Sequence, residues 1–132
     1  MTAAASGKHV LLVDDDEALL RLLRTWLTSG GYDVVACDSF EAAKQQLTES
    51  PPDLLLTDVR LGAFNGLQLV ILAKDRRPDT VTVVMSAFDD SALRKEAADC
   101  GAQYLTKPFS SDGLLKSLTD VSSPADNDLA AR

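Results

Sequence analysis

The sequence has few of the residues that commonly bind zinc. It contains two cysteines and one histidine in 132 residues. Cys37 and Cys100 lie far apart and lack the close pairing of a zinc-binding motif, so we expect both to be small buried hydrophobic residues. We expect His9, at the start of the first apolar segment, to be a surface residue. These counts argue against a zinc centre.

Positive charge and long apolar runs are also scarce. The chain has 13 Lys and Arg against 20 Asp and Glu, for a formal net charge of -7. Nucleic-acid phosphates are bound by clustered Lys and Arg, so no direct DNA binding is expected. No apolar run approaches the roughly 20 residues of a membrane span, and the first residues are too polar for a signal peptide. We therefore expect a cytoplasmic protein without membrane insertion.

What the sequence does contain is a regular alternation of apolar and amphipathic segments. The apolar segments predict five strands, at residues 10–13, 33–37, 53–58, 81–85 and 102–106. Each is followed by apolar residues at helical spacing, which predicts five helices. In the first helix the apolar stripe comprises Leu19, Leu22, Leu23, Trp26 and Leu27. The third helix, at 66–75, is expected to bury Leu67, Val70 and Ile71.

This alternation predicts right-handed crossovers and a parallel sheet covered by helices on both faces. The fold class is therefore a doubly wound α/β domain with five parallel strands. We expect residues 1–7 to be disordered, residues 8–120 to form the domain, and residues 121–132 to be a solvated tail or linker.

Polar residues stand at the carboxyl ends of four of the predicted strands. Asp14 and Asp15 follow the first strand, Asp58 ends the third, Ser86 follows the fourth and Lys107 follows the fifth. Each alone has an ordinary structural explanation, as a helix cap, a turn residue or a solvated charge. With the strand order 2-1-3-4-5, however, all of them share one crevice at the ligand-binding edge of the sheet. Their joint placement favours a functional site.

These residues, together with Ala87 and the Pro108-Phe109 pair, make the chain resemble the receiver domain of two-component response regulators over residues 8–120. The resemblance, to chemotaxis-type regulators among others, implies the flavodoxin-like (βα)5 fold with strand order 2-1-3-4-5. It implies that Asp58 accepts a phosphoryl group from a sensor histidine kinase or a phosphotransfer protein.

The resemblance also assigns roles to the surrounding residues. Mg²⁺ would be held by the carboxylates of Asp14, Asp15 and Asp58 and by the backbone carbonyl of Arg60, which suits its preference for oxygen ligands. Lys107 would neutralise one phosphoryl oxygen. The protein would be a phosphoacceptor regulator rather than an enzyme, although it would assist its own phosphorylation and slow dephosphorylation.

A switch would follow from phosphorylation. Ser86 would donate its hydroxyl proton to the phosphoryl group, and Tyr104 matches the switch aromatic residue of the family. The surface of the fourth helix, fifth strand and fifth helix would then change and control a downstream protein or effector domain, with homodimer formation on activation as one option.

The sequence departs from the usual family pattern near the acceptor. Gly62 stands where proline is common and Asn65 where aspartate is common, so we expect the loop at 61–65 to be looser than usual. The resemblance implies that Arg60, two residues after the acceptor, and Phe88, two residues after Ser86, would flank the path of an attacking water. Their bulk predicts slow hydrolysis of the acyl phosphate.

Three other functions are compatible with parts of the pattern. A dehalogenase-type phosphatase shares the Asp-x-Asp spacing of Asp14 and Asp16, but it needs a further acidic pair on a strand beyond Lys107. A flavodoxin-like electron carrier needs a Ser, Thr or Gly phosphate loop after the first strand, where this chain has acids. A receiver that binds partners without being phosphorylated is the third. The sequence shows no effector domain, so a stand-alone regulator, a phosphorelay component and a piece of a larger protein all remain open.

Overall fold

The computed structural model describes residues 8–107 and 110–121. Five parallel strands form one sheet in the order β2-β1-β3-β6-β7. Their bounds are β1 His9–Val13, β2 Asp33–Cys37, β3 Leu54–Asp58, β6 Val81–Ser86 and β7 Gln103–Thr106. Because β6 and β7 are the fourth and fifth strands of this sheet along the chain, the predicted order 2-1-3-4-5 is confirmed.

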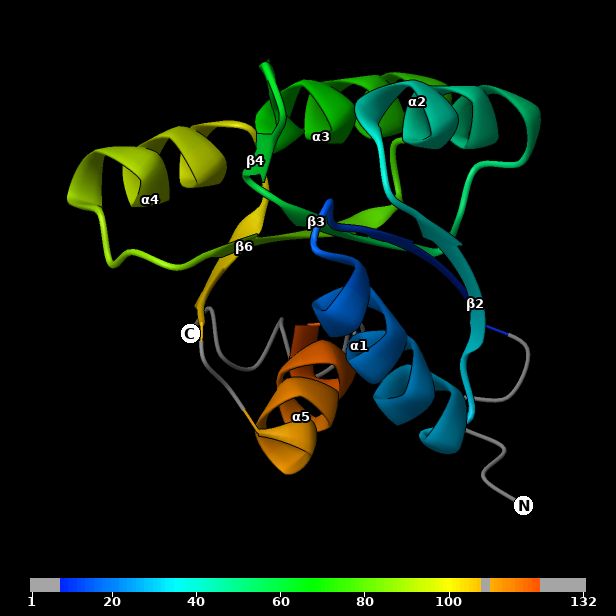
Figure 1. Cartoon of the computed structure of the whole chain (residues 1–132). Helices are drawn as coiled ribbons and strands as arrows, with labels where there is room; N and C mark the ends of the chain where they lie inside the picture. Colours follow the sequence, from blue (N-terminus) through cyan, green and yellow to red (C-terminus); the bar gives the residue numbers. More distant parts are fainter. Residues whose placement is uncertain (1–7, 108–109, 122–132) are drawn as a thin grey trace.

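Helices cover both faces of the sheet. They are α1 Glu17–Ser29, α2 Phe40–Glu49, α3 Gly66–Arg76, α4 Ser91–Asp99 and α5 Ser111–Val121. Helices α1 and α5 lie on one face, and α2, α3 and α4 lie on the other (Figure 1). The doubly wound fold class is therefore confirmed. None of the helices in the described ranges is both long enough and apolar enough to span a membrane.

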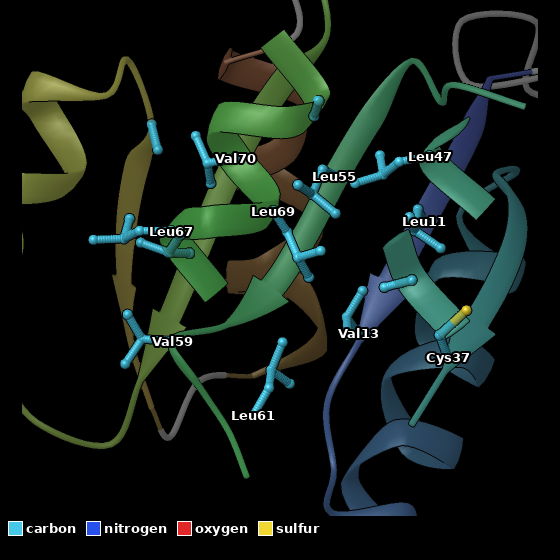
Figure 2. Close-up of a cluster of buried hydrophobic side chains, with 14 of the residues drawn as sticks. Leu11, Val13, Cys37, Leu47, Leu55, Val59, Leu61, Leu67, Leu69 and Val70 are labelled. Carbon is cyan, nitrogen blue, oxygen red and sulfur yellow. The ribbon is translucent and has the colours of Figure 1, made fainter. Parts of the chain in front are cut away.

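The core consists of two buried clusters, one on each face of the sheet. Because side chains alternate along a strand, Leu11 and Leu55 pack beneath α2 and α3, whereas Leu12 and Leu56 pack against α1 and α5. Figure 2 shows the first cluster, with the side chains of α3 lying over the strands. Each fully buried leucine contributes on the order of 2 kcal/mol through burial alone. A strand fixed from both faces gives a rigid base for the residue that ends it.

Two apolar residues expected in the core lie on the surface instead. Leu22 is 45% exposed and Ile71 is 59% exposed. The buried face of α3 is centred on Leu69, Val70 and Ala73, and Ile71 lies about 100° around the helix from Val70. The prediction that these two residues are buried was wrong, because residue type alone does not distinguish an apolar residue beside the buried face of a helix from one within it.

The loop expected at 61–65 is a paired hairpin, not a loose segment. Strands β4 Arg60–Leu61 and β5 Phe64–Asn65 form an antiparallel ladder joined by two residues. Gly62 has φ +62°, the backbone conformation that a tight turn of this kind needs. The ring of Phe64 stacks on that of Phe40, with centroids 4.4 Å apart. Asn65 caps α3 and forms a capping box with Gln68. Gly62 and Asn65 thus tighten the segment.

The remaining expectations concern the rare residues and the ends of the chain. Cys37 is buried, and burial raises the pKa of its thiol, with the nearby charge of Asp38 adding to the effect. Cys100 is only half-buried. His9 is exposed, as expected, with Nδ1 3.2 Å from a carboxylate oxygen of Asp33. The segments 1–7 and 122–132 and the Pro108-Phe109 pair lie outside the described residues, so the predicted domain boundaries stay predictions.

Candidate functional site

The polar residues singled out from the sequence meet at the carboxyl edge of the sheet. Hydrogen bonding of the ladder continues one residue past the strands: Asp14 N donates to Cys37 O at 3.2 Å, and Val59 N donates to Met85 O at 2.8 Å. Lys107 N donates to Ser86 O at 2.7 Å. The backbone of the site is therefore held by the sheet itself.

Three carboxylates form the centre of the site. Asp14, Asp15 and Asp58 each offer a carboxylate oxygen, and these oxygens lie within 4.8 Å of one another. Asp14 is 1% exposed, whereas Asp15 is open to solvent. Two such charges 4–5 Å apart repel by about 3–4 kcal/mol at an effective dielectric constant of 20. An oxygen-only, acidic cluster of this kind fits Mg²⁺, which prefers hard oxygen ligands.

Lys107 partly balances this negative charge. Its Nζ lies 2.9 Å from Asp14 Oδ2 and 3.2 Å from Asp58 Oδ1, and its side chain is only 18% exposed. Burial lowers the pKa of Lys107, but the hydrogen bonds and charges of the two aspartates outweigh this effect, so the net shift is upward. The ammonium group therefore stays charged and in contact with Asp58.

Asp58 is the carboxylate whose pKa is displaced upward. Burial is the largest cause, the charges of Asp14 and Asp15 add to it, and Lys107 opposes it. A carboxylate with a raised pKa holds its electron pair less firmly in the ionised form and is a better nucleophile than an ordinary one. Such a group, at a strand end and with 13% of its side chain exposed, can attack an electrophile that enters the crevice.

The two flanking aspartates are oriented differently. Asp14 Oδ1 accepts a hydrogen bond from Asp16 N at 2.9 Å, while its other oxygen pairs with Lys107. Asp15 Oδ2 accepts from Gly62 N at 3.2 Å, which ties the acidic cluster to the β4–β5 hairpin. Both contacts leave further oxygen lone pairs for a cation.

The two predicted switch residues are joined through one residue, Phe88. Ser86 is buried, and its Oγ accepts a hydrogen bond from Phe88 N at 3.1 Å. Tyr104 is on β7, and its hydroxyl donates to Phe88 O at 2.5 Å. The guanidinium of Arg94 lies over the Tyr104 ring, with Cζ 4.6 Å from the centroid. Sequence reasoning missed Arg94, because no motif marks the contacts of a helical arginine with a later strand.

Arg60 and Phe88, predicted to flank the acceptor, lie together. Arg60 Cζ is 5.8 Å from the centroid of the exposed Phe88 ring. The contact joins the β4–β5 hairpin to the segment between β6 and α4. The backbone carbonyl of Arg60 as a metal ligand stays a prediction.

Comparison with known families gives one clear result. The model of the response regulator receiver domain matches residues 10–119. The chain belongs to this family. As a receiver domain it is a signalling domain of a two-component system and not an enzyme in the ordinary sense. Receiver domains generally bind Mg²⁺ at an acidic pocket, and they interact with histidine kinases and downstream effectors.

Relatives with regulatory names share this receiver domain. The response regulator protein FleR of Pseudomonas aeruginosa is 39% identical over 111 residues, which are 80% of this chain and 23% of that protein. The transcriptional regulatory protein GlrR of Escherichia coli is 33% identical over 114 residues, which are 86% of this chain and 26% of that protein. KdpE of Mycobacterium tuberculosis is 36% identical over 83% of this chain and 48% of that protein. The chain thus spans about a quarter to a half of these relatives.

Solved structures share the receiver fold. A CheY-like receiver domain from Methanospirillum hungatei superposes with a TM-score of 0.84 at 23% identity, covering 92% of this chain and 98% of that one. A response regulator from Burkholderia pseudomallei, solved with a phosphorylated aspartic acid, a calcium ion and citrate, superposes with a TM-score of 0.80 at 25% identity, covering 94% of this chain and 71% of that one.

Proposed function

We propose that this receiver domain is a phosphorylation-dependent switch in which Asp58 accepts a phosphoryl group from a sensor histidine kinase or a phosphotransfer protein, with Mg²⁺ bound. The observation that carries the proposal is the position of Asp58, which has Lys107 on one oxygen and the carboxylates of Asp14 and Asp15 within 4.8 Å. The Asp58 carboxylate therefore lies beside one positive charge, the Lys107 ammonium group, and beside two carboxylates that can bind a metal cation.

The transfer forms a bond between a carboxylate oxygen of Asp58 and phosphorus. The bond between phosphorus and the donor histidine nitrogen breaks, its electron pair stays on that nitrogen, and the imidazole takes up a proton from water. Lys107 neutralises charge on the moving group, and the Ser86 hydroxyl donates to another of its oxygens. Asp14, Asp15, Asp58 and the Arg60 carbonyl would hold Mg²⁺, which would supply further positive charge when bound.

Phosphorylation then changes the surface formed by α4, β7 and α5. A phosphoryl group on Asp58 attracts Ser86, and Ser86 is linked through Phe88 to Tyr104, which stands on this surface. A downstream protein, an effector domain or a second copy of the chain reads the change. Because the net charge is -7, this domain does not bind DNA itself. A cytoplasmic location is part of the proposal.

The experiment is phosphorylation by a small donor. Purified protein is incubated with acetyl phosphate and Mg²⁺, and its intact mass is measured. We expect one added phosphoryl group on the wild type, none on Asp58→Asn, and none after chelation of the metal. Asp38→Asn is the matched control, because Asp38 follows β2 at the same edge of the sheet but lies outside the acidic cluster. Equal labelling of Asp58→Asn would refute the assignment.

The same experiment separates the alternatives. A receiver that binds partners without phosphorylation gains no mass and binds its partner equally well as wild type and Asp58→Asn. A dehalogenase-type phosphatase releases phosphate from small phosphoesters over many turnovers. In the described part of the chain only α5 follows Lys107 beyond the sheet, so the additional acidic strand of such an enzyme has no counterpart there.

A further inference from the structure

One guanidinium group on α4 connects two segments of the chain beside the acceptor site. Arg94 Nε lies 2.5 Å from Asp89 Oδ1, in the segment that follows β6. Arg94 Nη2 donates to Thr106 Oγ1 at 3.1 Å, and Cζ lies 4.6 Å from the centroid of the Tyr104 ring. Both of these last contacts are with β7. Arg94 therefore bridges the β6–α4 segment to β7.

The contacts of Arg94 lead to the acceptor site through two hydrogen bonds. The hydroxyl of Tyr104 donates to the carbonyl of Phe88, and the Phe88 N–H donates to Ser86 Oγ. A serine hydroxyl that accepts one hydrogen bond can still donate its own proton. The Phe88 peptide groups therefore set the direction in which the buried Ser86 hydroxyl can point, and Tyr104 fixes the Phe88 carbonyl.

We propose that Arg94 is a positioning residue for phosphoryl transfer: it holds the Tyr104 ring so that the Tyr104–Phe88–Ser86 chain of hydrogen bonds keeps the Ser86 hydroxyl available to the phosphoryl group. This inference rests on the proposed function. Arg94 itself touches neither Asp58 nor the transferred group. Arg94 acts through Tyr104: the flat face of its guanidinium group covers the Tyr104 ring, and the N–H groups at the edge of the guanidinium bind Asp89 and Thr106.

The chemistry of the side chain favours this role over that of an ordinary surface ion pair. An exposed Arg–Asp pair alone contributes little, because water and salt screen it. A guanidinium, however, can stack on an aromatic ring and donate from its edge at the same time, which a lysine ammonium cannot do in this geometry. The neighbouring Lys95 is the contrast: it pairs with Asp99 one turn along the same helix, at 3.2 Å.

The first test observes Tyr104 in the unphosphorylated protein. The sequence has two tyrosines, so Tyr32→Phe leaves Tyr104 as the only one, and its ring can be followed by NMR after labelling of tyrosine. We expect Arg94→Ala to shift the Tyr104 ring resonances strongly and Arg94→Lys to shift them partly. Lys95→Ala, the control on the same helix, should leave them in place. Unchanged resonances in Arg94→Ala would overturn the proposal.

The second test is a double-mutant cycle on the rate of phosphorylation by acetyl phosphate with Mg²⁺. Loss of a cation–π contact corresponds to about a two- to fivefold change, so Arg94→Ala should slow the reaction by about that factor. In Tyr104→Phe the ring remains but the hydroxyl link to Phe88 is gone, so adding Arg94→Ala should slow it no further. An equal factor in both backgrounds would mean that Arg94 does not act through Tyr104.

The results distinguish failure of the Arg94 proposal from failure of the proposed function. If the wild type gains no phosphoryl group on Asp58, the proposed function is wrong, and the Tyr104 resonances alone decide whether Arg94 holds the ring. If the wild type is phosphorylated but the cycle shows independent effects, the proposed function stands and the role of Arg94 is refuted.

Discussion

Replacing Gly66 by alanine tests whether α3 fixes the acceptor strand. Gly66 is the buried first residue of α3, and its N–H donates to Val59 O at 2.7 Å. A Cβ at this position would lie 2.1 Å from the backbone oxygen of Asp58 and 3.1 Å from Thr57 Oγ1. The Asp58 oxygen is itself held, because it accepts a hydrogen bond from Thr57 Oγ1 at 3.0 Å. Either the helix start or the acceptor backbone must move.

The expected cost follows from two opposing effects. Overpacking a well-filled site costs roughly 1–3 kcal/mol, and a clash with backbone atoms belongs at the upper end of that range. Alanine gains about 1 kcal/mol over glycine in helix propensity. We therefore expect Gly66→Ala to lower the free energy of unfolding by about 2 kcal/mol. If the Asp58 backbone is the part that moves, phosphorylation should slow on the order of 100-fold, since a 1 Å misplacement of a reacting group has that effect.

The assay combines urea denaturation with the rate of phosphorylation by acetyl phosphate. Two glycines serve as controls. Gly113→Ala lies in α5, where the added Cβ meets only the Ser110 hydroxyl oxygen at 3.0 Å, so the helix-propensity gain should dominate and stability should stay unchanged or rise by up to about 1 kcal/mol. Gly62→Ala has no atom within 4 Å but keeps φ +62°, so it measures backbone strain alone, about 1–2 kcal/mol. A Gly66→Ala protein as stable and as reactive as the wild type would refute the reasoning.

Three further predictions concern the charges and the access route of the site. Because the pKa of Asp58 is raised in the folded state, its contribution to stability is present at low pH and is lost as the pH rises through that pKa; metal-free Asp58→Asn should therefore be more stable than the wild type at pH 7, with a difference that shrinks toward pH 4 in urea melts. Asp15→Ala should unfold within about 0.5 kcal/mol of the wild type without metal, since this carboxylate is exposed, yet lose Mg²⁺-dependent phosphorylation; a large loss of metal-free stability would contradict a functional acidic cluster. Arg60→Ala with Phe88→Ala should lose the phosphoryl group faster than the wild type in a decay measured by intact mass, because the contact between the two side chains is removed; an unchanged lifetime would exclude them as a barrier to water.

The sequence predicted that these polar residues would meet at one edge of the sheet, because each stands at a strand end. Asp58, Ser86 and Lys107 each follow a short apolar run, and parallel strands bring such positions to one edge by geometry alone. The fold followed from the same alternation of strands and helices. These features are local in sequence or are set by topology, so they can be inferred without coordinates.

The features that escaped prediction depend on tertiary contact. The two-residue strands β4 and β5 are too short to leave a hydrophobic pattern, so the sequence alone indicates a loose loop at Gly62, whereas this residue closes a tight turn. Ile71 was assigned to the core because neighbouring positions on a helix differ only in which way they face. Arg94 contacts Tyr104 and Thr106 on β7, and no spacing in the sequence indicates that these residues meet.

The end of the sheet opposite the acceptor site offers an exposed position for chemical attachment. The amino ends of the strands lie opposite the acceptor site, about 16–20 Å away for strands of five or six residues. There Arg77 pairs with Asp53 at 2.8 Å and with Asp79 at 3.1 Å, and the side chain of Asp79 is 78% exposed. A dye, biotin or surface linker placed at position 79 would be remote from Asp58, at the other end of the strands. Immobilised in this way, the domain would present its reactive edge to kinases in solution.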